Sequence, residues 1–289
     1  MDYLKYYNKA FIGGYWMVGL MDKLDGSHIY KRVPVPSGQW LADPFLYEYN
    51  GRHFLFVEQY FNSKNRAGIG VYEIEDGKPI HNSIIIDNSY HMSYPCVFLY
   101  NGTHYMIPES SSNQTLDLYV ADEFPLKWSL KKTLVSGRRL VDTTVVVRED
   151  VVFLLTYENN SNGWILSSYC MDMNDYSLSK IGETYYNANV GRPAGLIFEQ
   201  DGRLFRPAQN CSTKYGESLL VYEVIELSKN SYREQFAYEI KCSDVKFEEH
   251  FERIHTLNND SRYEVVDVFQ EHFDFFHWWK IFKRKFLKK

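Results

Sequence analysis

A repeat of about 50 residues constrains the fold of this chain more than any other feature of its sequence. Four segments carry an equivalent Pro or Thr near their start, at spacings of 51, 48 and 50 residues: Pro44, Pro95, Thr143 and Pro193. Each segment opens with a polar residue and contains two apolar stretches joined by a turn pair such as Asn50-Gly51. Asn-Gly between alternating apolar runs is a strong signal for a β-hairpin. A fifth segment begins at His255 after a longer gap.

Further strand-like stretches, such as "GIGVYEIEDGKPI" and "TLDLYVADE", fill the space between the hairpins. Each repeat therefore has room for about four strands, which is typical of a β-propeller blade. We expect an all-β, five-bladed β-propeller over residues 1–270, with blade repeats near positions 42, 93, 141, 191 and 255. The alternative is a two-sheet sandwich whose segments resemble one another by accident.

The composition excludes several classes of protein. A formal net charge of −5 argues against a nucleic-acid-binding molecule. The four cysteines are widely spaced and form no CxxC pair, so we expect free thiols rather than disulfides or a zinc site. The N-terminus lacks the apolar run of a signal peptide, and no stretch approaches the roughly 18 apolar residues of a membrane-spanning helix. A cytoplasmic protein is therefore expected.

Equivalent positions of the repeat predict a polar ring. The innermost strands of a propeller begin near one mouth of its central channel, so residues about 50 apart should converge there. The first ring would contain Asp43, Tyr94, Asp142, Arg192 and His255. The ends of the second strands would add Glu58, Glu109, Glu158 or Tyr157, Gln209 and Asp267. Scaffold positions are normally apolar and alike, whereas these are polar and differ between repeats, which indicates a binding or catalytic site.

Several of these residues also allow purely structural interpretations. Asp43 and Asp142 could each cap a strand through an Asx turn. Glu109 could be a paired structural carboxylate, and Arg192 could simply bridge the carboxylates and hold them ionised. A single histidine such as His255 is more often structural than catalytic.

The C-terminal segment, residues 271–289, has a composition unlike the rest of the chain. From Trp278 onward it is rich in Lys and Arg and contains no acidic residue, and aromatic and aliphatic residues alternate with the basic ones. This predicts a short amphipathic helix at the surface of an anionic membrane. The alternatives are a disordered basic tail or a helix docked on the propeller.

Six motifs resemble a known family in their order along the chain: "ADPF", "HMSYPCVF", "YMIPES", "GRPAG", "FRPAQNCSTKYGESLLVYEV" and "HTLN". They resemble the propeller domain at the N-terminus of plant glucosamine inositolphosphorylceramide transferases and its bacterial relatives in polysaccharide gene clusters. The domain is more remotely similar to the five-bladed glycoside hydrolases of family 43. In the plant relatives, the propeller stands beside a separate transferase domain.

The resemblance implies roles for individual residues. Asp43 matches the hydrolase base or nucleophile, and Asp142 the aspartate that tunes it. The hydrolases carry their general acid, a glutamate, about where this chain has Arg192, while Glu109 lies in the second repeat. An arginine there would neutralise a leaving phosphate, which an activated donor carries and a plain glycoside does not.

These implications predict a glycosyltransferase of cell-surface polysaccharide synthesis. Asp43 would be the base, while Glu109 and Asp142 would bind sugar hydroxyls or a divalent metal ion. The donor would be phosphate-activated, with a furanosyl or phosphoribosyl unit suggested by the remote relatives, and the acceptor a lipid-linked glycan. The expected location is the cytoplasmic face of the membrane, through residues 278–289. The other substrate-binding residues would be Arg192, Arg206, Gln209, Asn210, His255, Glu58 and Tyr94. The alternatives are a family-43-like glycoside hydrolase and a non-catalytic glycan-binding propeller.

Overall fold

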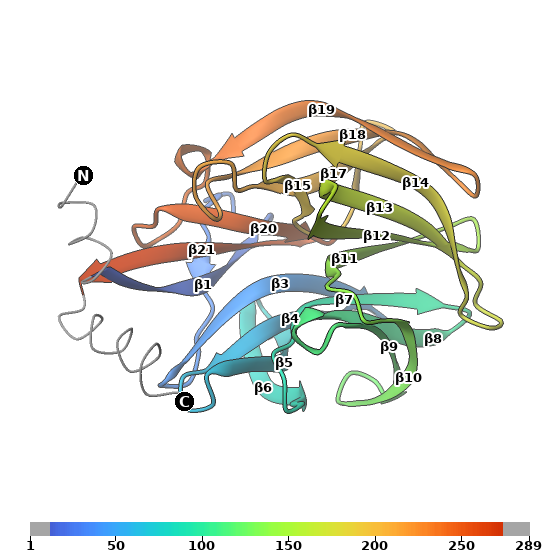
Figure 1. Cartoon of the computed structure of the whole chain (residues 1–289). Helices are drawn as coiled ribbons and strands as arrows, with labels where there is room; N and C mark the ends of the chain where they lie inside the picture. The colour runs from blue at the N-terminus through green and yellow to red at the C-terminus, as the bar shows by residue number, and fades with distance from the viewer. Residues whose placement is uncertain (1–11, 274–289) are drawn as a thin grey trace, which may run out of the picture.

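The computed structural model describes residues 12–273 and consists almost entirely of antiparallel β-sheet (Figure 1). The first blade contains β3 (Gln39–Tyr49), β4 (Arg52–Phe61), β5 (Arg66–Glu75) and β6 (Lys78–Ile86). The second contains β7 (Ser93–Tyr100), β8 (Thr103–Ser110), β9 (Thr115–Glu123) and β10 (Lys127–Ser136). The third contains β11 (Val141–Arg148), β12 (Val151–Asn160), β13 (Gly163–Met171) and β14 (Leu178–Tyr186).

The fourth blade contains β15 (Val190–Pro193), β17 (Arg203–Asn210), β18 (Ser218–Ser228) and β19 (Ser231–Lys241), and β16 (Phe198–Gln200) pairs with β17. The fifth contains β20 (Arg253–Asn259), β21 (Tyr263–Phe273), β1 (Ile12–Asp22) and β2 (Lys31–Arg32). The structure thus confirms the all-β, five-bladed propeller, and the sandwich alternative is wrong.

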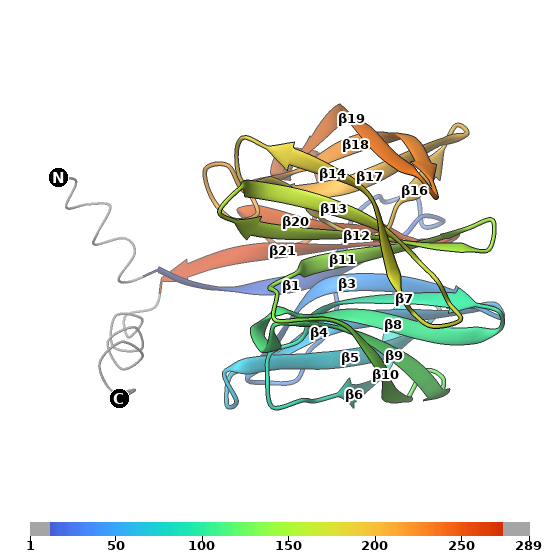
Figure 2. The same cartoon turned by 45° about the vertical axis from the view of Figure 1, so that its right-hand side comes forward.

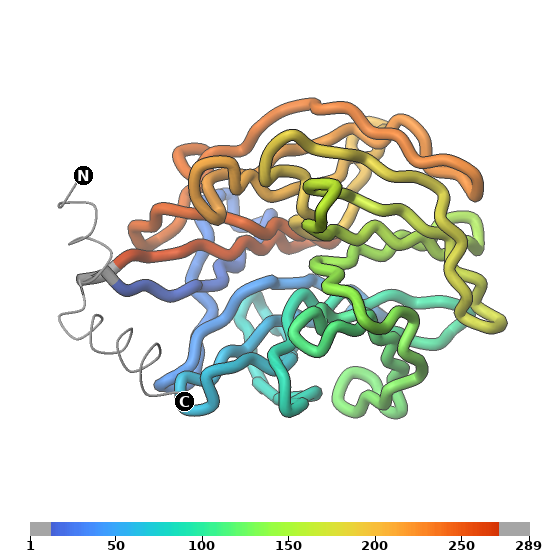
Figure 3. The backbone as a smooth tube through the Cα atoms, in the orientation of Figure 1, coloured from blue at the N-terminus to red at the C-terminus, as the bar shows by residue number. Residues whose placement is uncertain are grey.

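Two ends of the described chain close the ring. The first strand, β1, pairs with β21 in continuous register from Ile12 opposite Phe273 to Asp22 opposite Tyr263. Figure 2 shows the two strands running together, and in the tube of Figure 3 the blue and red segments lie side by side. The fifth blade is therefore assembled from both ends of the described chain, which the repeat pattern did not predict.

The helical elements within the described residues are two short 3-10 helices, η1 (Ser111–Asn113) and η2 (Cys242–Asp244). Over residues 12–273 no helix is long and apolar enough to cross a membrane. The strand β21 continues to Phe273, so the boundary expected at residue 270 is three residues too early. The expected helix otherwise falls on residues 274–289, outside the described part of the chain.

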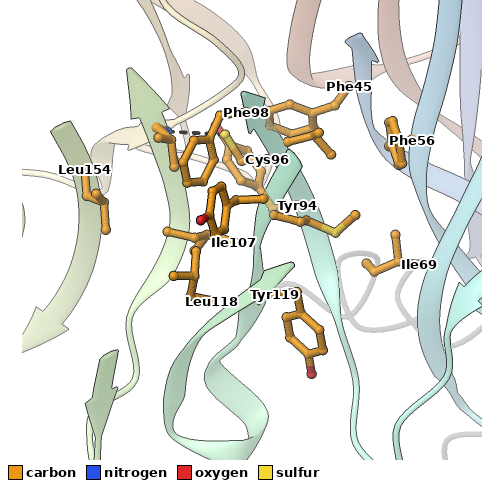
Figure 4. Close-up of a cluster of buried hydrophobic side chains, with 14 of the residues drawn as sticks. Phe45, Phe56, Ile69, Tyr94, Cys96, Phe98, Ile107, Leu118, Tyr119 and Leu154 are labelled. Carbon is orange, nitrogen blue, oxygen red and sulfur yellow. Dashed lines mark hydrogen bonds between the residues drawn. The ribbon is translucent and has the colours of Figure 1, made fainter. Parts of the chain in front are cut away.

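The core lies between the faces of neighbouring blades. Figure 4 shows a section in which side chains of three blades interlock: Phe45, Phe56, Ile69, Tyr94, Cys96, Phe98, Ile107, Leu118, Tyr119 and Leu154. The four cysteines carry free thiols, as expected: Cys96, Cys170, Cys211 and Cys242. Because successive side chains of a strand point to opposite faces of the sheet, each blade presents a set of apolar side chains to each of its two neighbours.

Tyr94 of the second blade contacts residues of the first, third and fourth blades. Its ring packs against Phe45 at a centroid distance of 4.7 Å, and its hydroxyl lies 2.8 Å from Thr144 Oγ1. The same hydroxyl accepts a hydrogen bond of 2.7 Å from the backbone N–H of Gly195. Side chains of four blades therefore meet in the middle of the ring.

Candidate functional site

The innermost strands carry a β-bulge at the repeat-equivalent position. In three blades the bulged residue is not glycine, yet it adopts a positive φ: Asp43 (46°), Tyr94 (48°) and Asp142 (48°). This left-handed conformation costs about 1–3 kcal/mol and is concentrated at functional sites. A bulge re-aims a side chain that regular pairing would direct elsewhere.

In the fourth blade the bulge falls at Gly191, with a φ of 84°, and Arg192 follows it in register with Gln209. In the fifth blade it falls at His255. Arg192 therefore stands one position beyond the place that Asp43 takes in its own blade. Both nevertheless belong to the same ring of interacting side chains.

Asp43 is buried at the centre of this group, with 8% of its side-chain surface exposed. Its carboxylate accepts hydrogen bonds from the Thr256 hydroxyl at 3.1 Å and from the Tyr94 backbone N–H at 3.2 Å. Burial raises the pKa of Asp43 to about 7, although nearby His255 lowers it. Such a carboxyl can both accept and hold a proton near neutral pH, which suits a general base.

Asp267 orients the neighbours of Asp43. Its carboxylate accepts hydrogen bonds from the backbone N–H groups of Asp43 and Thr256, each at 2.8 Å. Its Oδ2 atom also lies 2.7 Å from His255 Nδ1. Burial alone would lower the pKa of His255, but the carboxylates of Asp267 and Asp43 outweigh it and raise that pKa. The two aspartates therefore favour the charged form of His255.

Arg192 connects a second set of carboxylates. Its guanidinium forms two hydrogen bonds with Asp142, one of them Nη2 to Oδ1 at 2.9 Å, and a third with Glu109 at 3.3 Å. The Gln209 amide also donates to Asp142 at 2.8 Å. Burial raises the pKa of Asp142 to about 7, although Arg192 lowers it. The bridging role considered for Arg192 is therefore present in the structure.

Glu58 lies in the same group of acids. Burial raises its pKa well above the ordinary value, and the charges of Asp43 and Glu109 raise it further. Its Oε1 atom is 3.3 Å from His91 Nε2. Because His91 Nδ1 accepts a hydrogen bond from the Ala67 backbone N–H, the ring proton lies on Nε2, facing the carboxyl.

Other residues expected at the site lie elsewhere. The Arg206 side chain is fully buried and forms two hydrogen bonds with Glu234, at 2.6 and 2.7 Å, so it does not line the mouth. Asn210 binds the Ser218 hydroxyl, and Glu158 pairs with Arg138. Tyr94 is completely buried, as described above, so its backbone alone reaches Asp43.

Aromatic residues at the mouth had no counterpart among the predicted site residues. Trp16 of β1 stacks on His255 with a centroid distance of 3.8 Å. Tyr215 meets the same imidazole edge-on at 5.2 Å. Tyr215 lies within the quoted "FRPAQNCSTKYGESLLVYEV" motif and could have been noticed there, but Trp16 lies outside every repeat.

The predicted metal ligands do not fit a metal ion. Arg192 lies between Asp142 and Glu109 and occupies the position that a cation would take. Asp43, His255 and Asp267 do bring one ligand atom each within 4.8 Å of one another. However, both oxygens of Asp267 already accept backbone hydrogen bonds, and His255 Nδ1 lies within hydrogen-bond distance of Asp267, at 2.7 Å. The contacts of these residues suit acid–base chemistry and hydrogen bonding.

Two solved structures with the same fold are named as glycoside hydrolases or their catalytic domains. The catalytic domain of an α-L-arabinofuranosidase from Coprinopsis cinerea aligns with a TM-score of 0.58, covering 90% of this chain and 98% of that one, at 13% identity. A thermostable family-43 glycoside hydrolase aligns with a TM-score of 0.56, covering 84% and 93%, at 12% identity. At these identities the similarity shows the fold alone.

Two plant proteins are more similar in sequence. Glucosamine inositolphosphorylceramide transferase 1 of Arabidopsis thaliana is 35% identical over 216 residues, which cover 69% of this chain and 27% of the plant protein. Its counterpart in Oryza sativa subsp. japonica is 31% identical over 206 residues, covering 68% and 27%. The match thus spans 27% of the length of these relatives.

The family model described as "Glucosamine inositolphosphorylceramide transferase 1, N-terminal" matches residues 29–273. This range includes the innermost strand of every blade and all of the carboxylates described above. The chain therefore belongs to the family of N-terminal domains of glucosamine inositolphosphorylceramide transferases.

Proposed function

We propose that this chain is a glycosyltransferase of cell-surface polysaccharide synthesis that uses a phosphate-activated sugar donor and a glycan or glycolipid acceptor. The observation that carries the proposal is Asp43, a nearly buried carboxyl with a pKa of about 7 beside an arginine that is anchored by two acids. The relatives named as transferases support the reaction class.

In the proposed reaction, the acceptor hydroxyl attacks the anomeric carbon and loses its proton to Asp43. The bond between that carbon and the phosphate oxygen breaks, and its electron pair leaves with the phosphate. Arg192 has 23% of its side chain exposed, and its Nη1 atom has no hydrogen-bond partner among residues 12–273. That free edge would stabilise the charge on the leaving phosphate.

A second candidate function is glycoside hydrolysis, favoured by Glu58. Burial and the neighbouring carboxylates raise the pKa of Glu58 well above its usual range, which favours the protonated form that a general acid requires. Glu58 and Asp43 would then act as acid and base. The third candidate is a glycan-binding module without catalysis, because the chain matches 27% of each plant relative.

One experiment separates the three candidates. The purified chain is incubated with lipid-linked or soluble glycan acceptors and a panel of activated sugars, and separately with simple arabinosides and xylosides. For transfer, Asp43→Asn should lower kcat/KM by about 10²–10⁴-fold. Asp201→Asn, the same change in an exposed turn, is the control.

Full transfer activity in Asp43→Asn would show that Asp43 is not the base. Sugar release from the simple glycosides that is lost in Glu58→Gln would support hydrolysis. Glycan binding without turnover in any assay, unchanged in Asp43→Asn, would support the binding module.

A location at the cytoplasmic membrane surface is also proposed. It is supported by the basic and aromatic composition of residues 278–289, which lie outside the described part of the chain. Co-sedimentation with anionic vesicles, compared with neutral vesicles and with a chain ending at residue 277, tests it. Equal sedimentation of the two chains would contradict the proposed role of these residues.

A further inference from the structure

Tyr215 stands over the cationic side of the site. The Arg192 guanidinium carbon lies 5.9 Å from the centre of its ring, and His255 meets the ring edge at 5.2 Å. Tyr215 is 41% exposed. Within residues 12–273 the Tyr215 hydroxyl has no hydrogen-bond partner.

The loop that carries Tyr215 is fixed on both sides. The Gly216 carbonyl accepts a hydrogen bond of 2.9 Å from the Ile254 backbone N–H, and Lys214 donates to the Glu252 carbonyl at 3.1 Å. Gly216 has a φ of +71°, and a Cβ atom there would lie 3.0 Å from the Trp16 ring. A glycine is therefore needed to place Tyr215 over Arg192.

Packing alone does not account for this ring. His255 is already covered by Trp16, which stacks on it at 3.8 Å and is only 8% exposed. Tyr215 instead leaves 41% of its surface exposed, with the Arg192 guanidinium carbon 5.9 Å from the centre of its ring. Binding sites for small polar molecules combine an apolar wall with a few placed hydrogen-bonding groups in this way.

We propose that Tyr215 and the Nη1 edge of Arg192 form a subsite for one sugar unit of the substrate. The phenol ring would lie against the C–H groups of the sugar, and the hydroxyl and guanidinium would bind its oxygens. The inference rests on the proposed function only in taking the substrate to be a sugar. It assigns Tyr215 as a specificity-determining residue.

Binding rather than turnover provides the test. Free pentoses and hexoses and their 1-phosphates are titrated into the full chain, with calorimetry and with tryptophan fluorescence. Of the six tryptophans, Trp16 has its ring 5.9 Å from Tyr215. Loss of one hydrogen bond in Tyr215→Phe should weaken binding by about 5-fold. Tyr215→Ala, which also removes the ring, should weaken it by at least about 10-fold.

Two further sets of variants complete the design. Gly216→Ala keeps the phenol but displaces the loop, so it should weaken binding as Tyr215→Ala does, and thermal melting will show that the propeller remains folded. Tyr185, which is 57% exposed on β14, supplies the matched controls Tyr185→Phe and Tyr185→Ala, and these should bind as the wild type does.

The subsite is refuted if both Tyr215 variants bind every tested sugar as tightly as the wild type, or if no sugar binds to the wild type. A different result would count against the proposed function: binding of free sugars that depends on Tyr215, with no gain from the 1-phosphate and no transfer. In that case the subsite stands, and the phosphate-activated donor does not.

Discussion

At the scale of single residues, the site stores unfavourable energy in two forms. Asp43 and Asp142 adopt left-handed backbone conformations, and burial raises the pKa of each to about 7. Neither feature improves stability. Residues that are costly to the fold and that gather at one mouth are more readily explained by chemistry than by packing.

This leads to a prediction on pH dependence. The ordinary pKa of an aspartate is 3.8, so between about pH 4 and 7 folded Asp43 holds a proton that the unfolded chain releases. Wild-type stability should therefore fall as the pH rises through this window. Asp43→Asn removes that titration and should gain on the order of 2 kcal/mol over the wild type at pH 8, with a smaller gain at pH 5.

Urea unfolding at the two pH values measures this difference, and Asp201→Asn serves as the exposed control. An equal effect of Asp43→Asn at pH 5 and pH 8 would contradict the raised pKa. If ionised Asp43 is the base, kcat/KM of the wild type should also rise with pH around 7.

At the scale of elements, hydrogen bonds tie the fifth, first and second blades each to the bulge of the next blade. Asp267 of β21 accepts the Asp43 backbone N–H, and Glu109 of β8 accepts that of Asp142 at 3.3 Å. Asp43 in turn accepts the Tyr94 backbone N–H. Glu109 is thus the paired carboxylate that was considered. The hydrogen bonds of Asp43 and Asp142 run to other blades and not to their own turns, so the Asx turns considered for them are not seen within residues 12–273.

Arg206 of β17 was predicted to bind the substrate but has a structural role. Its guanidinium pairs with Glu234 of β19 and donates to the Gly191 carbonyl at 3.1 Å, directly before Arg192. The Tyr186 hydroxyl accepts a further hydrogen bond of 3.1 Å. Arg206 therefore stabilises the pairing of β17 with β15.

Arg206→Met should destabilise the fold by about 3–5 kcal/mol, because it leaves the buried Glu234 carboxylate without its cation. Arg206→Met combined with Glu234→Leu should recover much of that loss, since no buried charge remains. Arg233→Met, which breaks an ion pair whose side chains are 67% and 36% exposed, should cost below about 1 kcal/mol. Urea denaturation of the wild type, Arg206→Met, Glu234→Leu, the double variant and Arg233→Met measures this, and additive single effects in the double variant would contradict it.

At the scale of the whole molecule, closure of the ring depends on β1. Val18 of β1 is 1% exposed and packs in one cluster with Leu41 and Leu46 of the first blade and Val265 of β21. The same strand completes the fifth blade and seals it against the first. Because Trp16 of β1 stacks on His255, closure also finishes the site.

Val18→Asp should therefore disrupt the fold as a whole, since an unpaired carboxylate would be buried in the closing seam. We expect loss of cooperative thermal unfolding and of soluble protein. Leu24→Asp, at a residue that is 76% exposed just after β1, is the matched control and should behave as the wild type. A soluble, cooperatively melting Val18→Asp would show that β1 is dispensable for closure.

The sequence by itself determined the architecture and most members of the ring. Repeated hairpins with the same turn and apolar pattern can bury their faces only against one another, so the number of blades follows from the number of repeats. Polar residues at equivalent positions of such repeats must converge, which is why Asp43, Asp142 and Arg192 were found together.

Tertiary structure alone decided the rest. The direction of a side chain near a bulge depends on register, so no pattern separated Arg192, which faces two acids at the mouth, from Arg206, which is buried beside Glu234. Trp16 joined the site through pairing of strands from opposite ends of the described chain, a contact that local sequence does not encode. The raised pKa values, likewise, come from burial that exists only after five blades have closed.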